Sequence, residues 1–137
     1  MWKFYALLSA LFAAATALLA KVGVKGISGN VATAVRTSIV LFMAWLIVFF
    51  GGQMKEVKGL SKANLVFLVL SGLATGLSWI FYFKALETGE VSKVAPIDKL
   101  SVVFVIILSF LLLHEPIDLK TVIGAVLITA GAIILLL

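Results

Sequence analysis

The 137-residue sequence contains no cysteine, one histidine and two prolines, and only 12% of its residues are charged. Without cysteine the chain has neither disulfides nor thiol chemistry. One histidine and no Cys/His cluster do not provide the ligands of a structural metal site. The histidine forms no recognisable catalytic triad with a serine or cysteine nucleophile, and there is no glycine-rich phosphate loop. We therefore expect no enzymatic activity, no cofactor and no metal.

The low charge contrasts with a hydrophobic fraction of 64% and a mean hydropathy of +1.27. Soluble domains carry about a quarter charged and about half apolar residues. This composition predicts a multi-pass integral membrane protein with the lipid bilayer as its surroundings. The net charge of +5 does not indicate nucleic-acid binding, because the basic residues occur singly at the ends of apolar runs.

Five apolar segments cover about 3–22, 31–50, 64–83, 93–113 and 119–137. Each approaches the roughly 20 residues that a helix needs to cross a hydrocarbon core about 30 Å thick. The links are short, so we predict an all-α membrane protein with one domain, 1–137, of five transmembrane helices. The first segment also resembles a signal peptide, but four further spans follow and we interpret it as a retained helix.

Small residues at helical spacing favour close packing between membrane helices. The first segment has a stripe of alanines, the third has a GxxxG pair, and the fifth has two glycines about two helical turns apart. We expect packing at Ala6, Ala10, Ala13, Ala17, Gly72, Gly76, Gly124 and Gly131.

The third segment carries a polar stripe of Ser71, Thr75, Ser78 and Tyr82, with Trp79 at its border. Steps of four, three and four residues put these side chains on one helical face. Lipid offers hydroxyl groups no hydrogen-bonding partner, so the stripe predicts a water-accessible cavity that receives a solute. The alternative is that the hydroxyls form ordinary hydrogen bonds between helices.

The fourth segment places Asp98 and Lys99 side by side at membrane depth. With Ser92 as the expected N-cap, Asp98 lies roughly 9 Å inside the helix. Adjacent helical residues do not face each other, so we do not expect these two to pair. Asp98 shares a face with Ser101, and we predict that Asp98, Lys99 and Ser101 contribute to a solute site.

Arg36 lies inside the second segment, which we expect to begin after Asn30 as its N-cap. The guanidinium either faces the cavity or reaches back to the membrane surface. For Asp98, the alternative to a transport role is a structural ion pair with a cation such as Arg36 or Lys84.

The second half of the chain resembles the EamA family of the drug/metabolite transporter superfamily. The resemblance rests on FYFKALETGEVSKVAP and on LSVVFVIILSFLLLHEPIDLKTVIGAVLITAGAIILL. These contain the "AL" turn at Ala85 and Leu86, the Leu-rich end of the fourth segment before Glu115, and the GAxLIxAG pattern that starts at Gly124. The first two segments fit more loosely.

The resemblance implies secondary transport of a small metabolite or drug-like solute by alternating access. It also implies one five-helix half of a ten-helix inverted-repeat bundle, located in a prokaryotic plasma membrane. His114 replaces a usual glycine, Thr121 a frequent glutamine, and Asp98-Lys99 stands where the family is commonly apolar. The first helix lacks the glutamate that small multidrug-resistance relatives use for proton coupling, so that mechanism does not carry over.

Five spans place the two termini on opposite sides of the membrane, so an inverted second unit requires a second copy inserted upside down. Orientation normally follows a lysine and arginine bias, and this chain has almost none. Five basic residues fall on the N-terminal side and six on the other: Lys3, Lys55, Lys58, Lys62 and Lys120 against Lys21, Lys25, Arg36, Lys84, Lys93 and Lys99. We therefore predict an antiparallel homodimer. The main alternative is a non-transporting accessory or assembly subunit, and a simple pore is a weaker one.

Overall fold

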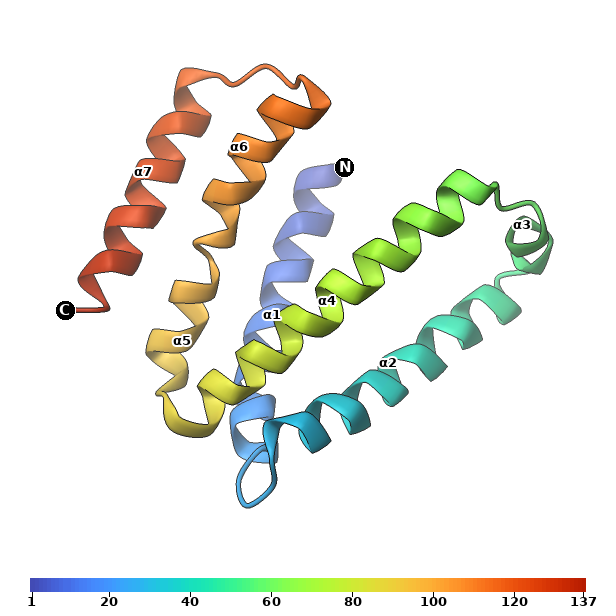
Figure 1. The fold of residues 1–137 in the computed structure, drawn as a ribbon, viewed down its shortest axis with the longest axis horizontal. Helices are drawn as coiled ribbons and strands as arrows, with labels where there is room; N and C mark the ends of the chain where they lie inside the picture. The colour runs from blue at the N-terminus through green and yellow to red at the C-terminus, as the bar shows by residue number, and fades with distance from the viewer. The chain divides into compact units, whose positions relative to one another are not determined.

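The computed structural model describes residues 1–137 and contains helices but no strands. In chain order the helices are α1 (Trp2–Gly23), α2 (Gly29–Phe50), α3 (Met54–Lys58), α4 (Lys62–Thr88), α5 (Val91–Asp98), α6 (Ser101–Leu113) and α7 (Leu119–Ile134) (Figure 1). They form two compact units, Met1–Thr88 and Gly89–Leu137.

Four helical segments are long and apolar enough to cross a membrane: α1, α2, α4 and the stretch Val91–Leu113, which contains α5 and α6. The shorter apolar helix α7 follows. The all-helical membrane architecture predicted from the sequence is confirmed, with changed boundaries. α4 continues to Thr88, five residues beyond the predicted 83, and α7 ends at Ile134 rather than at 137.

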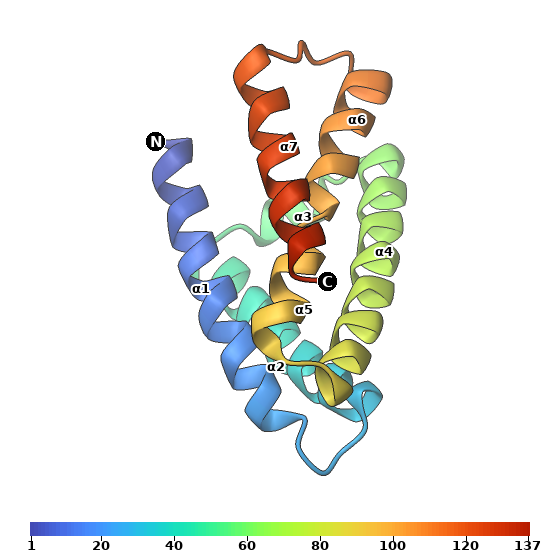
Figure 2. The same cartoon turned by 90° about the vertical axis from the view of Figure 1, so that its left-hand side faces the viewer.

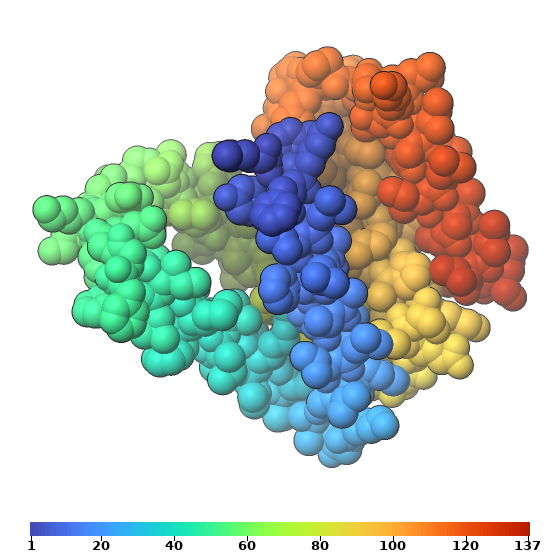
Figure 3. Space-filling model, turned by 180° about the vertical axis from the view of Figure 1, so that it is seen from behind, coloured from blue at the N-terminus to red at the C-terminus, as the bar shows by residue number.

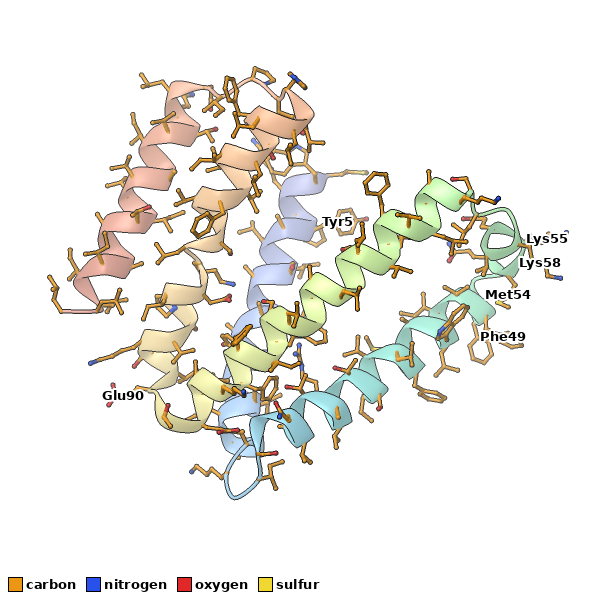
Figure 4. All side chains as sticks on the ribbon, in the orientation of Figure 1. Tyr5, Phe49, Met54, Lys55, Lys58 and Glu90 are labelled. Carbon is orange, nitrogen blue, oxygen red and sulfur yellow. The ribbon has the colours of Figure 1, made fainter.

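In the N-terminal unit, α2 and α4 form a helical hairpin connected through α3, and α1 packs against α4. The two long helices are closest where α2 begins and α4 ends, and they diverge towards α3 (Figure 1). Lys55 and Lys58 project from α3 at the turn, near Met54 and Phe49 (Figure 4). Lysines beside aromatic and apolar residues are typical of the membrane surface.

Gly29 allows the close approach of α2 to α4. A Cβ atom here would lie 2.7 Å from Glu87 Oε1 and 3.0 Å from the carbonyl carbon of Phe83. The Gly29 amide donates a hydrogen bond to Glu87 Oε1, and Lys21 Nζ donates to the carbonyl oxygen of Leu86 at 2.5 Å. The carboxylate thus lies at the start of α2 and the ammonium near the end of α4, where each complements the helix dipole.

Residues close to each helix start determine where the helix begins, but two of the predicted N-caps were wrong. Ser28 rather than Asn30 is the N-cap of α2, since its side chain accepts from the Val31 amide. Glu90 rather than Ser92 precedes α5, and it makes no side-chain cap. Asp118 is the N-cap of α7, and its side chain accepts from the Thr121 amide at 2.9 Å. Hydrogen bonds from the Thr121 hydroxyl and then from its amide lower the pKa of Asp118.

The predicted fourth helix is not continuous. Lys99 and Leu100 separate α5 from α6, and their amides donate to Pro96 and Ile97 carbonyl oxygens at 3.0 and 2.9 Å. These bonds span three residues instead of four, so the turn is tighter than an α-helix. In the C-terminal unit α7 then runs antiparallel to α6 (Figure 2).

Few side chains are buried by the chain itself. The buried hydrophobic residues are Ala17, Ala20, Val24, Ala32, Phe83, Leu86 and Ala132. Ala17 of the predicted alanine stripe is therefore buried, as is the neighbouring Ala20, whereas Ala6, Ala10 and Ala13 are exposed. Figure 3 views the molecule from behind and shows the side chains of α1, in blue, at the surface. Large apolar side chains remain exposed along every span, as expected for a surface that contacts lipid or a second protein.

The four glycines expected at packing positions do not meet a close neighbour within their own units. A Cβ atom added at Gly72, Gly76, Gly124 or Gly131 would find no atom within 4 Å. Inside each unit these four glycines therefore have no close packing partner, and helix packing between chains at these positions stays a prediction.

Candidate functional site

The side chain of Arg36 extends from α2 towards α4. Arg36 is seven residues beyond the start of α2 at Gly29, or roughly 10 Å along the helix axis. Its Cζ atom lies 4.2 Å from the centre of the Trp79 ring and 5.8 Å from that of Phe83, both in α4. A guanidinium over an indole face is stabilised by about 0.5 to 2 kcal/mol, most strongly when water is excluded. The aromatic residues thereby hold a charge at membrane depth.

No carboxylate neutralises Arg36 within its unit. The N-terminal unit contains two acidic residues, Glu56 in α3 and Glu87 at the end of α4. Neither forms an ion pair with Arg36, and the Glu87 carboxylate accepts from the Gly29 amide. An unneutralised cation in a span is costly unless it serves a polar ligand or a water-filled space.

A cavity of about 370 Å³ adjoins Arg36 between α1 and α2. Its polar lining residues are Arg36 and Thr16, and Phe83 of α4 contributes an aromatic wall. The remaining lining residues are aliphatic or glycine: Leu19, Ala20, Gly23, Ile27, Ala32 and Val35. Arg36 is thus the only charged residue of an otherwise mainly apolar cavity.

A second cavity, of about 360 Å³, lies on the other side of α2. Its polar residues are Asn30, Thr33, Thr37 and Ser38, and α4 contributes Ile80. The Thr33 and Thr37 hydroxyls each donate at 2.7 Å to the carbonyl oxygen four residues earlier. Each hydroxyl keeps an acceptor lone pair available, so this wall can accept hydrogen bonds from water or a solute.

The polar stripe predicted on α4 divides into two parts. Ser71, Thr75 and Ser78 are exposed, and none of them lines either of these cavities. The Thr75 hydroxyl donates to the Ser71 carbonyl oxygen at 2.9 Å. Trp79 and Tyr82 are half-buried at the end of α4 that meets α2. Water access to the whole stripe stays a prediction.

Asp98 and Lys99 lie in the C-terminal unit and form an ion pair, with Lys99 Nζ 3.3 Å from Asp98 Oδ2. The expectation that these neighbours would not pair was wrong, because the long lysine side chain reaches back to the adjacent carboxylate. Both are substantially exposed, at 38% for the Asp98 side chain and 57% for that of Lys99. Ser101 is exposed at the start of α6.

The C-terminal unit also has a cavity of about 440 Å³ between α6 and α7. Aliphatic side chains such as Val103, Ile106 and Val126 line it. Its one hydroxyl, that of Thr129, donates to the Ala125 carbonyl oxygen. Without a charged residue this cavity cannot orient a charged solute, so the Arg36 cavity is the better candidate site.

Sequence reasoning missed several of these residues. Thr33 and Thr37 are four residues apart and follow Asn30 by three and seven, the same periodicity that drew attention to α4. The same periodicity test applied to the second segment would have predicted the second cavity, beside α2. The pairing of Gly29 with Glu87 had no comparable signal, because it joins residues 58 positions apart.

The chain matches the EamA-like transporter family over residues 1–137, its full length. It belongs to this family. A relative described as "Uncharacterized transporter in cobO 3'region", from Sinorhizobium sp., is 47% identical over 134 residues, which cover 98% of this chain and 95% of the relative. No solved structure gives a significant match.

Membership of the EamA-like family, together with the apolar helices, identifies an integral membrane protein of transporter type. The family and the relative's description point to a transporter and not to an enzyme. The resemblance inferred from the AL turn, the Leu-rich helix end and the GAxLIxAG segment is confirmed.

Proposed function

We propose that this EamA-like protein is a secondary transporter that moves a small metabolite or drug-like solute by alternating access. The observation that carries the proposal is Arg36, a charged side chain about 10 Å into α2 that lines a cavity large enough for a small solute. An arginine at this depth that no carboxylate of its unit neutralises supports a site for a polar ligand. The polar groove on the other side of α2 adds hydrogen-bonding groups near the same helix.

We further propose that the working unit is an antiparallel homodimer in the plasma membrane of a prokaryote. Inverted-repeat transporters place their solute site between two oppositely oriented halves near the midplane. This chain supplies four membrane-spanning segments and one shorter apolar helix, the content of one such half. The exposed apolar surface of both units is available for a second copy.

Purified protein in liposomes tests the transport proposal directly. A panel of radiolabelled small solutes should include at least one that enters saturably. Unlabelled solute trapped inside should accelerate that entry, because counterflow requires a site that alternates between the two sides, whereas a pore gives none. Arg36→Gln should abolish entry, while Lys25→Gln, a matched loss of charge in the α1–α2 turn outside the cavity, should not. No flux for any solute, with a stable complex with another membrane protein, would favour an accessory subunit.

A further inference from the structure

We infer that the Arg36 cavity binds a small organic anion that has one carboxylate and an apolar body. The inference deepens the proposed function, on which it rests, by assigning a class of solute to the site. Four features of the N-terminal unit carry it: the single charge of the cavity, the lack of a neutralising carboxylate, the orientation that Trp79 imposes, and the apolar walls.

The sign of the charge selects the ligand. Arginine remains protonated at all physiological pH values, so the cavity always presents a positive group. Within the unit neither Glu56 nor Glu87 forms an ion pair with it. A ligand carboxylate would supply the missing negative charge. An organic cation would instead meet repulsion from Arg36, and the aromatic face that could attract it is already occupied by the guanidinium, 4.2 Å from the Trp79 ring centre.

The stacking of Arg36 on Trp79 also orients the guanidinium for a carboxylate. A guanidinium that lies over an aromatic ring has one face covered, while its N–H donors point outward in its own plane. A carboxylate can accept two of these in the parallel arrangement that makes arginine–carboxylate pairs strong and directional. Trp79 therefore acts as a positioning residue, because it restricts the rotamers of Arg36 and reduces the ordering that binding requires.

The rest of the cavity determines the shape of the ligand. Leu19, Ile27 and Val35 provide aliphatic walls, and Thr16 provides one hydroxyl. A volume of about 370 Å³ is at the small end of ligand cavities. A compact monocarboxylate with a hydrocarbon chain matches this lining, whereas a sugar or a dicarboxylate would leave polar groups unsatisfied against aliphatic side chains.

Three probes of equal chain length test which head-group charge the cavity prefers: hexanoate, hexan-1-ol and hexylammonium. Binding is measured to the full-length protein in lipid nanodiscs, with Trp2→Phe and Trp45→Phe so that Trp79 is the only tryptophan. Hexanoate should change Trp79 emission saturably, because it alters the guanidinium that lies over the indole. Hexan-1-ol and hexylammonium should bind about tenfold more weakly or not at all.

Variants locate the site. Arg36→Gln should weaken hexanoate binding about tenfold or more, and Arg36→Lys should recover only part, since lysine lacks the planar fork. Lys25→Gln is the matched control and should leave binding unchanged. Val35→Phe keeps Arg36 but fills the cavity, and it should also weaken binding, so the test does not depend on one variant folding. Equal binding of hexanoate and hexan-1-ol, or hexanoate binding that survives both Arg36→Gln and Val35→Phe, would overturn the inference.

The outcomes also separate this inference from the transport proposal. Hexanoate binding that depends on Arg36, without flux of any solute, would support the site and contradict transport. Saturable counterflow of a cation or a neutral solute, with no carboxylate binding, would support transport and contradict the anion site.

Discussion

The guanidinium of Arg36 stacks on the indole of Trp79, with 4.2 Å between Cζ and the ring centre. This contact joins α2 to α4 and holds the guanidinium beside the cavity. No carboxylate of the N-terminal unit neutralises that positive charge. The same pair therefore serves the packing of the helical hairpin and the presentation of a charge. The two roles can be separated by mutation.

The stacking energy can be measured in a double-mutant cycle. Trp79→Leu and Arg36→Gln should each lower the free energy of unfolding in detergent, and the pair should couple by about 0.5 to 2 kcal/mol. Trp79→Phe should cost less, because a phenyl ring still attracts a cation, though more weakly. Unfolding by sodium dodecyl sulfate, followed by circular dichroism, gives the values. Strictly additive single effects would mean that the stacking contributes no stability.

Gly29 should tolerate no side chain. In Gly29→Ala the Cβ atom would lie 2.7 Å from Glu87 Oε1 and 3.0 Å from the Phe83 backbone, so α2 and α4 must separate. We expect a loss of about 1 to 3 kcal/mol in unfolding free energy, the usual effect of overpacking. Gly72→Ala is the control, because its Cβ meets no atom within 4 Å, and it should be neutral or slightly stabilising in monomeric protein.

The Asp98–Lys99 pair offers a test of function against folding. Both side chains are substantially exposed on the chain by itself, so neither is part of its packed core. Asp98→Asn should therefore leave expression and detergent stability near those of the wild type while removing transport in liposomes. Lys99→Gln breaks the same ion pair and should likewise leave detergent stability near that of the wild type. Unstable protein, or normal transport by Asp98→Asn, would show that the pair is structural.

The cap of α7 should depend on pH. Hydrogen bonds from Thr121 favour the ionised form and lower the pKa of Asp118 below its ordinary value of 3.8. A carboxyl group whose pKa is lowered on folding stabilises the folded state above its unfolded pKa, and this contribution is lost as the pH falls through the folded pKa. Amide exchange at Thr121 should be faster in Asp118→Ala than in the wild type at neutral pH. The difference should shrink below pH 3.8. A difference that persists to the lowest pH would point to a cap that needs no charge.

Dual topology should appear in reporter fusions at the C-terminus. One reporter active only in the cytoplasm and one active only outside should both give signal, because five basic residues on one side and six on the other provide no orientation bias. Adding two or three lysines to one side should silence one reporter. Signal from a single side in the unmodified protein would mean that an inverted partner must be a different chain.

The membrane class, the helices and the family could all be predicted from the amino-acid sequence. Composition excluded a soluble domain, and apolar length located the helices within a few residues, except where Pro96, Asp98 and Lys99 lie close together and the helix breaks. The Asp118 cap was predictable because its partner, Thr121, is three residues away. Each of these features depends on contacts that are local in the chain.

Which helix faces meet depends on the three-dimensional packing of the chain. In a water-soluble helix the apolar side identifies the core, but a membrane helix is apolar all round and lipid is as apolar as its neighbours. The sequence could therefore nominate Arg36 and Trp79 but could not bring them together. Nor could it indicate that α2 passes α4 at Gly29, beside Glu87, instead of at Gly72 and Gly76. The register between α2 and α4 fixed those contacts, and with them the charged wall of the cavity.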